Sequence, residues 1–175
     1  LSLATTLDSK IPLIKYFVIP YYMWYALVLF SFIYIYTKNN EEFYKFAKCI
    51  VLTMLSALII FIFFQTSVSR PIIVGDDMFS NMIRNIYAND RPVNCCPSLH
   101  VALALICSIW VCRVSENRIL KSTVIVVGYL IILSTLFIKQ HVIMDVIVAF
   151  IQVFVLRNIV DRNPHVEYEE TVEIR

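Results

Sequence analysis

Glycine and charge are scarce in this chain of 175 residues. The two glycines, Gly75 and Gly128, are too few for the glycine-rich loops that cradle phosphates in Rossmann and P-loop nucleotide sites. Charged residues make up 16% of the chain, and the net charge of +2 comes from basic residues that are scattered along it. An ordinary soluble domain has about 25% charged residues. A disordered chain and a nucleic-acid-binding chain are both excluded.

Long uncharged runs are what the sequence has instead, and 59% of its residues are apolar. A run of about 20 such residues can cross the hydrocarbon core of a bilayer. The five blocks are residues 16–36, 50–68, 97–112, 122–138 and 141–156, of which the last carries one acid, Asp145. They predict an all-α fold, an integral membrane helical bundle with about five transmembrane helices. Because the chain opens on Leu1 and not on Met, we allow for a sixth helix upstream.

The loop between the second and third blocks, residues 69–96, is predicted to contain a surface helix. Asp76 and Asp77 can cap its start, and the apolar residues Phe79, Met82, Ile83 and Ile86 recur at helical spacing. We expect this helix at the membrane interface, either as a packed lid or as part of a lipid entrance. The acidic tail, residues 161–175, is expected to be a solvated terminus.

The cysteines are odd in number, and their spacing is not that of a metal site. They are Cys49, Cys95, Cys96, Cys107 and Cys112. We expect them to pack as small apolar residues, and we expect no metal.

Lysine and arginine divide unequally between the two sides of the predicted bundle. One side has six: Lys10, Lys15, Arg70, Arg84, Arg91 and Lys139. The other has nine: Lys38, Lys45, Lys48, Arg113, Arg118, Lys121, Arg157, Arg162 and Arg175. The positive-inside rule therefore assigns the second side to the cytoplasm.

Ionisable side chains at membrane depth are costly, so each one is a functional candidate. His141 and Asp145 lie four residues apart at the start of the fifth block, where one helix face would bring them together. His100 opens the third block, and alternation of the spans places it on the same side as Arg70 and the other two residues. Each taken alone is explained as an interfacial or helix-bridging residue. Together they supply the cation, nucleophile, carboxylate and acid that phosphoryl transfer needs.

Three segments resemble the signature motifs of the type 2 phosphatidic acid phosphatase and vanadium haloperoxidase superfamily. Arg70-Pro71 matches the end of the first motif, and Pro97-Ser98-Leu99-His100 matches the Pro-Ser-Gly-His of the second. Ser134-Thr135, five residues, His141, three residues and Asp145 keep the spacing of the third motif. The resemblance covers residues 65–156, within one phosphatase-like membrane domain over residues 1–160.

Three positions depart from the family pattern. Phe63 stands where the first motif opens on lysine, a contact that Gln65 is a candidate to supply. Leu99 replaces a glycine, and Thr135 replaces an arginine whose charge Lys139 can partly restore. The Ser-Leu-His and Lys-Gln-His triplets resemble the inositol phosphorylceramide synthase branch, which contains phosphotransferases as well as phosphatases.

The resemblance implies a role for each matching residue. His141 would be the nucleophile that forms a phosphohistidine, Asp145 would orient it, and His100 would be the general acid and base. The candidates for binding the substrate phosphate are Arg70, Ser98, Lys139, Thr135, Asn94 and Arg91. Arg91-Pro92 also competes as a first motif, although it lies too close to Pro97 for the family pattern, and Asn94 is equally well explained as a turn residue.

We therefore expect a metal-independent lipid phosphate phosphatase without a cofactor, acting on phosphatidic acid or a prenyl diphosphate. The alternatives are a lipid head-group phosphotransferase, a catalytically degenerate homologue and a transporter. The expected partners are the bilayer and a membrane lipid phosphate, with no nucleic acid and no predicted oligomeric state. We expect a multi-pass protein of the cell membrane with its site on the extracytoplasmic face.

Overall fold

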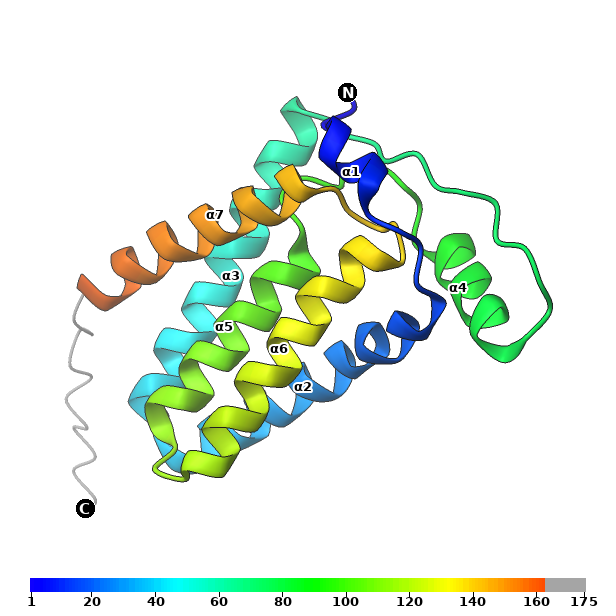
Figure 1. Cartoon of the computed structure of the whole chain (residues 1–175). Coiled ribbons are helices and arrows are strands. Elements are labelled where there is room, and N and C mark those ends of the chain that lie inside the picture. The colour runs from blue at the N-terminus through cyan, green and yellow to red at the C-terminus, as the bar shows by residue number, and fades with distance from the viewer. Residues whose placement is uncertain (163–175) are drawn as a thin grey trace, which may run out of the picture.

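The chain folds into a helical bundle in the computed structural model, which describes residues 1–162 (Figure 1). The elements are α1 (Thr6–Lys10), the short 3-10 helix η1 (Lys15–Phe17), α2 (Val18–Lys38), α3 (Asn40–Phe63), α4 (Met78–Asn89), α5 (Leu99–Val114), α6 (Arg118–Phe137) and α7 (Ile143–Arg162). Over this part of the chain there is no strand, only an isolated bridge between Ser67 and Val93. The predicted all-α class is confirmed.

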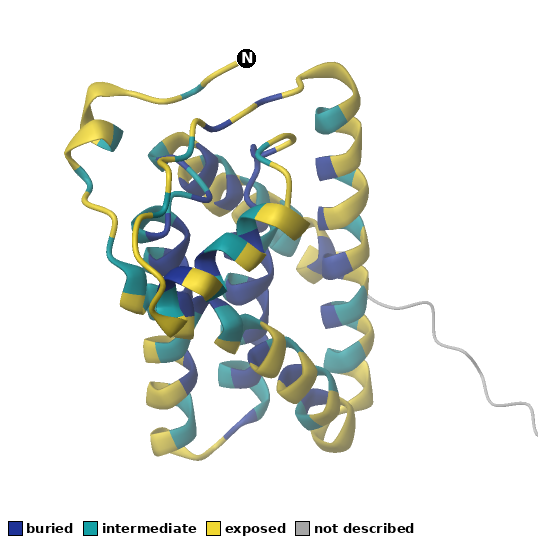
Figure 2. Ribbon diagram, turned by 90° about the vertical axis from the view of Figure 1, so that its right-hand side faces the viewer, coloured by how far each residue is buried: buried dark blue, intermediate teal, exposed yellow. Residues whose placement is uncertain are grey.

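Helix α5 forms the centre of the bundle and contacts α2, α3, α6 and α7. Eight of its 16 residues are buried, including Trp110 (Figure 2). Its length corresponds to about 24 Å, less than the roughly 30 Å of a hydrocarbon core. Because α5 is enclosed by neighbouring helices, it does not have to match the full thickness of the bilayer core. The longer helices around it are the ones that span the core.

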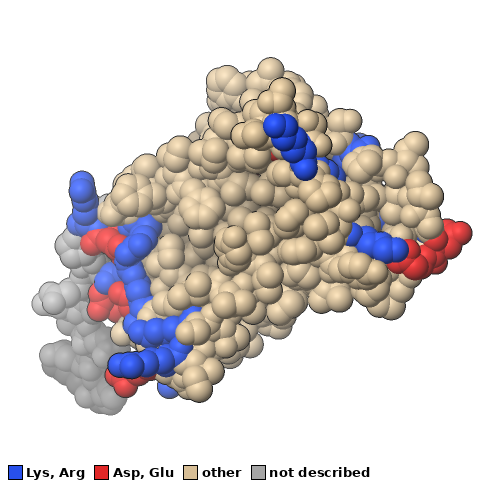
Figure 3. Space-filling view, in the orientation of Figure 1, with Lys and Arg blue, Asp and Glu red and all other residues tan. Residues whose placement is uncertain are grey.

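Four segments are long and apolar enough to cross a membrane, namely Lys15–Lys38, Asn40–Phe63, Arg118–Phe137 and Ile143–Arg162. Their apolar side chains point outward as well as inward, as in Ile62 of α3 and Phe154 of α7, which are both more than 60% exposed. Figure 3 shows an uncharged band between two ends where the charged side chains gather. Such an exposed apolar surface is that of a bundle surrounded by lipid.

Helix α3 begins ten residues before the predicted start of the second span and ends five before its predicted end. The Asn39 side chain caps it by accepting a hydrogen bond from the Glu42 amide at 2.9 Å. Glu41 and Glu42 stand in the first turn, where acidic residues favour a helix, and Lys45 pairs with both. At this end of α3, polar residues therefore mark the boundary of the membrane span, while the helix continues beyond that boundary.

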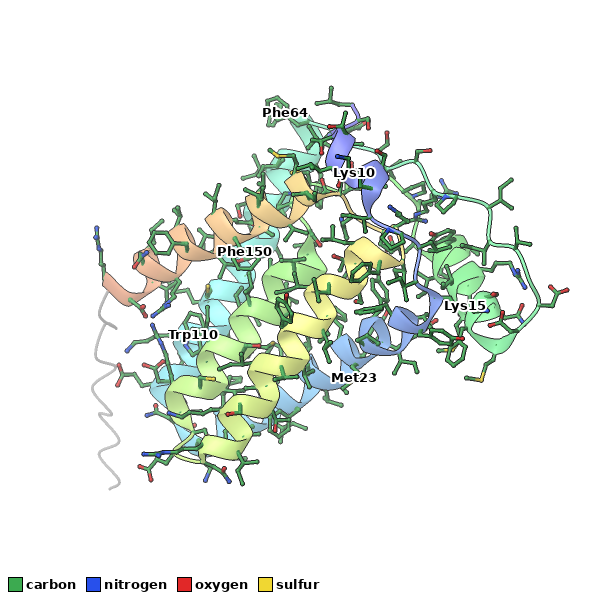
Figure 4. All side chains as sticks on the ribbon, viewed as in Figure 1. Lys10, Lys15, Met23, Phe64, Trp110 and Phe150 are labelled. Atoms are coloured by element: carbon green, nitrogen blue, oxygen red, sulfur yellow. The ribbon has the colours of Figure 1, made fainter. Side chains whose placement is uncertain are left out.

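One end of the bundle is covered by α1, η1 and α4 (Figure 1). Asp77 caps α4 as predicted, accepting from the amides of Phe79 and Ser80. Its other oxygen, Oδ2, forms an ion pair with Lys15 Nζ at 2.6 Å. Lys15 is labelled in Figure 4. The buried side chains Ile83 and Ile86 of α4 pack in one cluster with Val18, Tyr21 and Ile138. The predicted surface helix is thus a packed cover over the bundle end that carries the motifs.

The tail predicted over residues 161–175 starts inside α7, which continues to Arg162. Its remaining residues, 163–175, lie outside the described part of the chain. At this end Arg113 forms ion pairs with Glu42 and Asp161, which joins α3, α5 and α7. The five cysteines are free, and all except Cys112 are buried.

Candidate active site

His141 and Asp145 form a buried pair where α6 passes into α7. The Asp145 side chain is 1% exposed, and its Oδ2 accepts from His141 Nδ1 at 3.2 Å and from the Val142 amide at 3.1 Å. A carboxylate only accepts, so Nδ1 carries the proton and the lone pair lies on Nε2. The His141 ring is therefore oriented with its Nε2 turned away from the carboxylate.

The backbone before α7 differs from the prediction that both residues share a helix face. The helix begins at Ile143, so His141 lies in the preceding loop. The amides of Gln140 and His141 both donate to the Thr135 carbonyl at the end of α6, at 2.9 and 3.0 Å. The loop turns sharply at Lys139, whose φ is 59°. This turn, and not a helix face, brings the imidazole to the carboxylate.

His100 is the second residue of α5, and its ring faces that of His141 with 6.3 Å between centroids. Tyr21 stacks on it at 4.5 Å, and Trp24 lies against it at 4.7 Å. The Ser98 amide donates to the backbone carbonyl of Asp145 at 3.2 Å, which fixes the second motif against the third. Contacts from α2, α5 and α7 thus position the two imidazoles next to each other.

Arg70 lies in the loop after α3 and is fixed by the end of α4. Its Nη1 donates to the carbonyls of Asp90 at 2.6 Å and Tyr87 at 3.4 Å, and its guanidinium stacks over the Tyr87 ring at 4.7 Å. Burial lowers the pKa of Arg70, while the Asp90 carboxylate opposes that shift. The guanidinium stays charged because its normal pKa is far above neutrality.

These groups meet in a cavity of about 240 Å³, here called the reaction cavity. Its lining comprises Phe61, Arg70, Asp90, Arg91, Val93, Asn94, Cys95, Pro97, Leu99, His100, Gln140 and His141. Two histidines, two arginines and Asn94 are the predicted site residues among them. Asn94 has a left-handed φ of 56°, which asparagine tolerates well, and its backbone amide donates to the Thr66 carbonyl. It therefore serves both as a turn residue and as a lining residue.

A neighbouring cavity of about 410 Å³ lies on another side of Arg70 and His141, against the N-terminal segment. Lys139 lines this cavity, and its ammonium donates to the carbonyls of Asp8 and Ile11. The Asp8 carboxylate accepts from the Ile143 amide at 2.8 Å. Burial works to raise the pKa of Asp8, but hydrogen bonds from the backbone of Ile143 and Thr5 bring it below the usual value. The N-terminal segment thus supports the first turn of α7.

Two of the predicted phosphate-binding residues have their side chains engaged within helices. The Ser98 hydroxyl is the N-cap of α5 and accepts from the Val101 amide. The Thr135 hydroxyl donates to the Ile132 carbonyl within α6. Both side chains are fully buried. Their contribution to the site is the position of His100 and of the loop that carries His141.

Two residues next to the site were not among the predicted site residues. Gln140 is 1% exposed, and its Nε2 donates to Asp90 Oδ2 at 3.1 Å and Tyr21 Oη at 3.4 Å. Cys96 is buried next to Asp145, and burial followed by that carboxylate raises the pKa of its thiol to about 11. In the sequence Gln140 is only the middle residue of the Lys-Gln-His triplet, and a cysteine before a proline is common, so the fold is what reveals both as neighbours of the site.

A comparison with known protein families matches residues 1–157 to the PAP2 superfamily. No curated protein and no solved structure matches the chain. The matched region contains all three motif segments and every helix that lines the reaction cavity. The helical bundle has the apolar spans of a membrane protein, and the chain belongs to the PAP2 superfamily.

Proposed function

We propose that this protein is a membrane-embedded phosphatase of lipid phosphates that works through a phosphohistidine on His141. Superfamily membership supports phosphoryl transfer in general. The observation that carries the finer proposal is the pair of imidazoles whose centroids are 6.3 Å apart, one held by a buried carboxylate, at a cavity with two guanidinium groups. This arrangement provides a nucleophile, an acid and a phosphate-binding charge at one place.

In the first half-reaction His141 Nε2 attacks the phosphorus and an N–P bond forms. The P–O bond to the leaving alcohol breaks on the opposite side, and His100 gives its proton to the departing oxygen. The Asp145 carboxylate, 3.2 Å from Nδ1, stabilises the positive charge that the imidazole gains. The products are the phosphorylated enzyme and the leaving group, which is the free alcohol from phosphatidic acid or the prenyl monophosphate from a prenyl diphosphate.

In the second half-reaction His100 acts as a base. It removes a proton from water, whose oxygen attacks the phosphorus, and the N–P bond to His141 breaks. Inorganic phosphate leaves, and both imidazoles return to their first state. An alcohol in place of water would give a new phosphate ester through the same proton transfers.

Arg70 and Arg91 supply the positive charge for the non-bridging oxygens. Arg70 is anchored to two carbonyls and a tyrosine ring, so its guanidinium is placed before substrate arrives. Lys139 adds charge from the neighbouring cavity that also contains Arg70 and His141. Phe63, at the position of the family's lysine, ends α3 with 75% exposure, so it offers neither charge nor a hydrogen bond.

A lipid substrate suits a site at the end of an apolar bundle, since the phosphate reaches the cavity while the tails stay in the bilayer. We assign phosphatidic acid or a prenyl diphosphate as the substrate class. The opposite end carries more lysine and arginine, so we place the site on the extracytoplasmic face of the cell membrane.

Head-group transfer of the inositol phosphorylceramide synthase type is the second candidate. It is favoured by the Ser-Leu-His triplet at residues 98–100 and the Lys-Gln-His triplet at residues 139–141. Of these, Gln140 lines the reaction cavity as a fully buried side chain. Hydrolysis and transfer use the same two histidines and differ in the group that attacks the phosphohistidine.

The test is phosphate release by the purified protein in detergent, with a chelator present, from phosphatidic acid, a prenyl diphosphate and a phosphorylated sphingoid base. We expect release from one of these, and its loss in His141→Ala. Folded wild-type protein that releases no phosphate from any of them would refute the phosphatase. Phosphate ester formed only when a lipid alcohol is added would favour the transferase.

A further inference from the structure

A third cavity, of about 320 Å³, adjoins His100 on the side of α2 and α4. We call it the tyrosine cavity, and its lining is Tyr21, Tyr22, Tyr25, Asn85, Ile86, Asn89, Asp90 and His100. It shares His100 and Asp90 with the reaction cavity, whereas His141 and Arg70 line only the other cavities. The volume lies near the lower end of the roughly 300–1,000 Å³ typical of small-molecule sites. The proton-transferring imidazole thus separates two compartments.

The tyrosine cavity has hydroxyl and amide groups on a partly apolar lining and is close to electrically neutral. Lysine and arginine are missing from its lining, and its one acid, Asp90, lies within the electrostatic influence of the Arg70 guanidinium. An anionic ligand would find no counter-charge here. A cationic ligand would compete for a carboxylate that already accepts from Gln140 Nε2 at 3.1 Å. The cavity therefore fits an uncharged ligand.

Hydrogen-bonding groups in the cavity can both donate and accept. Asn89 Nδ2 donates to Asn85 Oδ1 at 2.9 Å, and Asn85 Nδ2 lies 3.4 Å from Tyr22 Oη. Amides and phenols retain further donor and acceptor positions after these contacts. Hydroxyl groups match such a surface, because each hydroxyl also donates and accepts.

In-line displacement determines which reactant lies here. In the second half-reaction the attacking oxygen approaches phosphorus on the side opposite the N–P bond, so it lies toward His100 and away from His141. The cavity that contacts His100 without contacting His141 is the space available to the rest of an acceptor alcohol.

We propose that the tyrosine cavity binds an acceptor alcohol that takes the place of water in the second half-reaction, and that it selects an uncharged alcohol bearing further hydroxyl groups beside the reacting one. This inference rests on the proposed function. The hydroxyl proton of the alcohol passes to His100, its oxygen forms a bond to phosphorus, and the N–P bond to His141 breaks.

The experiment uses the full chain in detergent with a short-chain phosphatidic acid as phosphoryl donor. Glycerol, 1-propanol or choline is added at equal concentration, and the ratio of new phosphate ester to inorganic phosphate is measured. Both products come from one phosphoenzyme, so the ratio reports the second half-reaction alone.

We expect glycerol to be preferred over 1-propanol and choline as the acceptor. Asn85→Ala and Asn89→Ala should each reduce that preference roughly two- to tenfold, the effect of one lost hydrogen bond. Asn81→Ala is the matched control, since Asn81 lies on α4 but outside the cavity and bonds to the Asp76 carbonyl. It should leave the preference unchanged.

The inference is overturned if glycerol has no advantage as the acceptor, if choline is preferred, or if the preference survives in both asparagine variants. Each of these results requires phosphate release, so the proposed function would still stand. Wild-type protein that releases no phosphate from any donor would instead refute the proposed function together with this inference.

Discussion

Replacing Asp145 by asparagine removes one charge from the site with the smallest change of shape. The carboxylate Oδ2 accepts from His141 Nδ1 and from the Val142 amide, while Oδ1 has no hydrogen-bond partner among the described residues. The asparagine oxygen can take the place of Oδ2, with its amide nitrogen at the Oδ1 position. Hydrogen bonds to a charged group contribute about 1.5–3 kcal/mol net, and about 1.4 kcal/mol corresponds to tenfold in rate. We therefore expect kcat to fall roughly tenfold to 150-fold.

The assay is phosphate release from the preferred lipid phosphate, with the thermal unfolding temperature measured on the same samples. Glu116→Gln is the matched control, because it removes one exposed charge in the turn between α5 and α6 at the opposite end of the bundle. It should keep wild-type kcat. If folded Asp145→Asn retains kcat within twofold of wild type, the carboxylate does not stabilise a charged imidazole and the reasoning is refuted.

Four further predictions follow from the geometry. His100→Ala should lose roughly a hundredfold to ten-thousandfold in kcat, and a smaller loss in initial-rate assays would argue against a general acid. Arg70→Lys should raise KM about tenfold, since lysine cannot hold both carbonyls and the ring stack, whereas an unchanged KM would remove this residue from phosphate binding. A Cβ at Gly128 would lie 2.5 Å from Ser108 Oγ, so Gly128→Ala should lower the unfolding temperature. The double variant Gly128→Ala with Ser108→Ala should restore the unfolding temperature, and a double variant that loses as much as Gly128→Ala alone would contradict this packing. Burial raises the pKa of the Cys95 thiol to about 11. Alkylation of Cys95 at pH 8, followed by mass spectrometry, should therefore be roughly a hundredfold slower than that of a free peptide thiol, and its rate should rise with pH. Rapid alkylation would contradict the burial of this thiol.

The helices of the bundle are predictable because their signal is strong and local. Uncharged runs identified all five helices of the bundle, and the apolar periodicity with Asp77 identified α4. The start of α3 was predicted ten residues late, because a charged turn resembles a loop in composition although Asn39 caps it as a helix. Hydropathy reports where a span ends and capping reports where a helix ends, and these differ whenever a helix extends beyond the bilayer.

The motif spacing predicts which residues meet, but not how the chain brings them together. His141 reaches Asp145 from a loop, through a turn at Lys139 that the spacing alone does not specify. The stacking of Tyr21 on His100 joins residues 79 positions apart, and the bond from Ile143 to Asp8 joins residues 135 positions apart. Contacts of this kind depend on the packing of whole helices, so they have no local pattern in the sequence.

The most direct test of the central claim is detection of the phosphoenzyme. Purified protein is incubated with a labelled lipid phosphate, quenched, and analysed for an acid-labile, base-stable label, in the wild type, His141→Ala and His141→Gln. The account predicts a label on a peptide containing His141 that is absent from both variants. A label that persists in folded His141 variants, or phosphate release without any phosphorylated His141 under rapid quench, would contradict it.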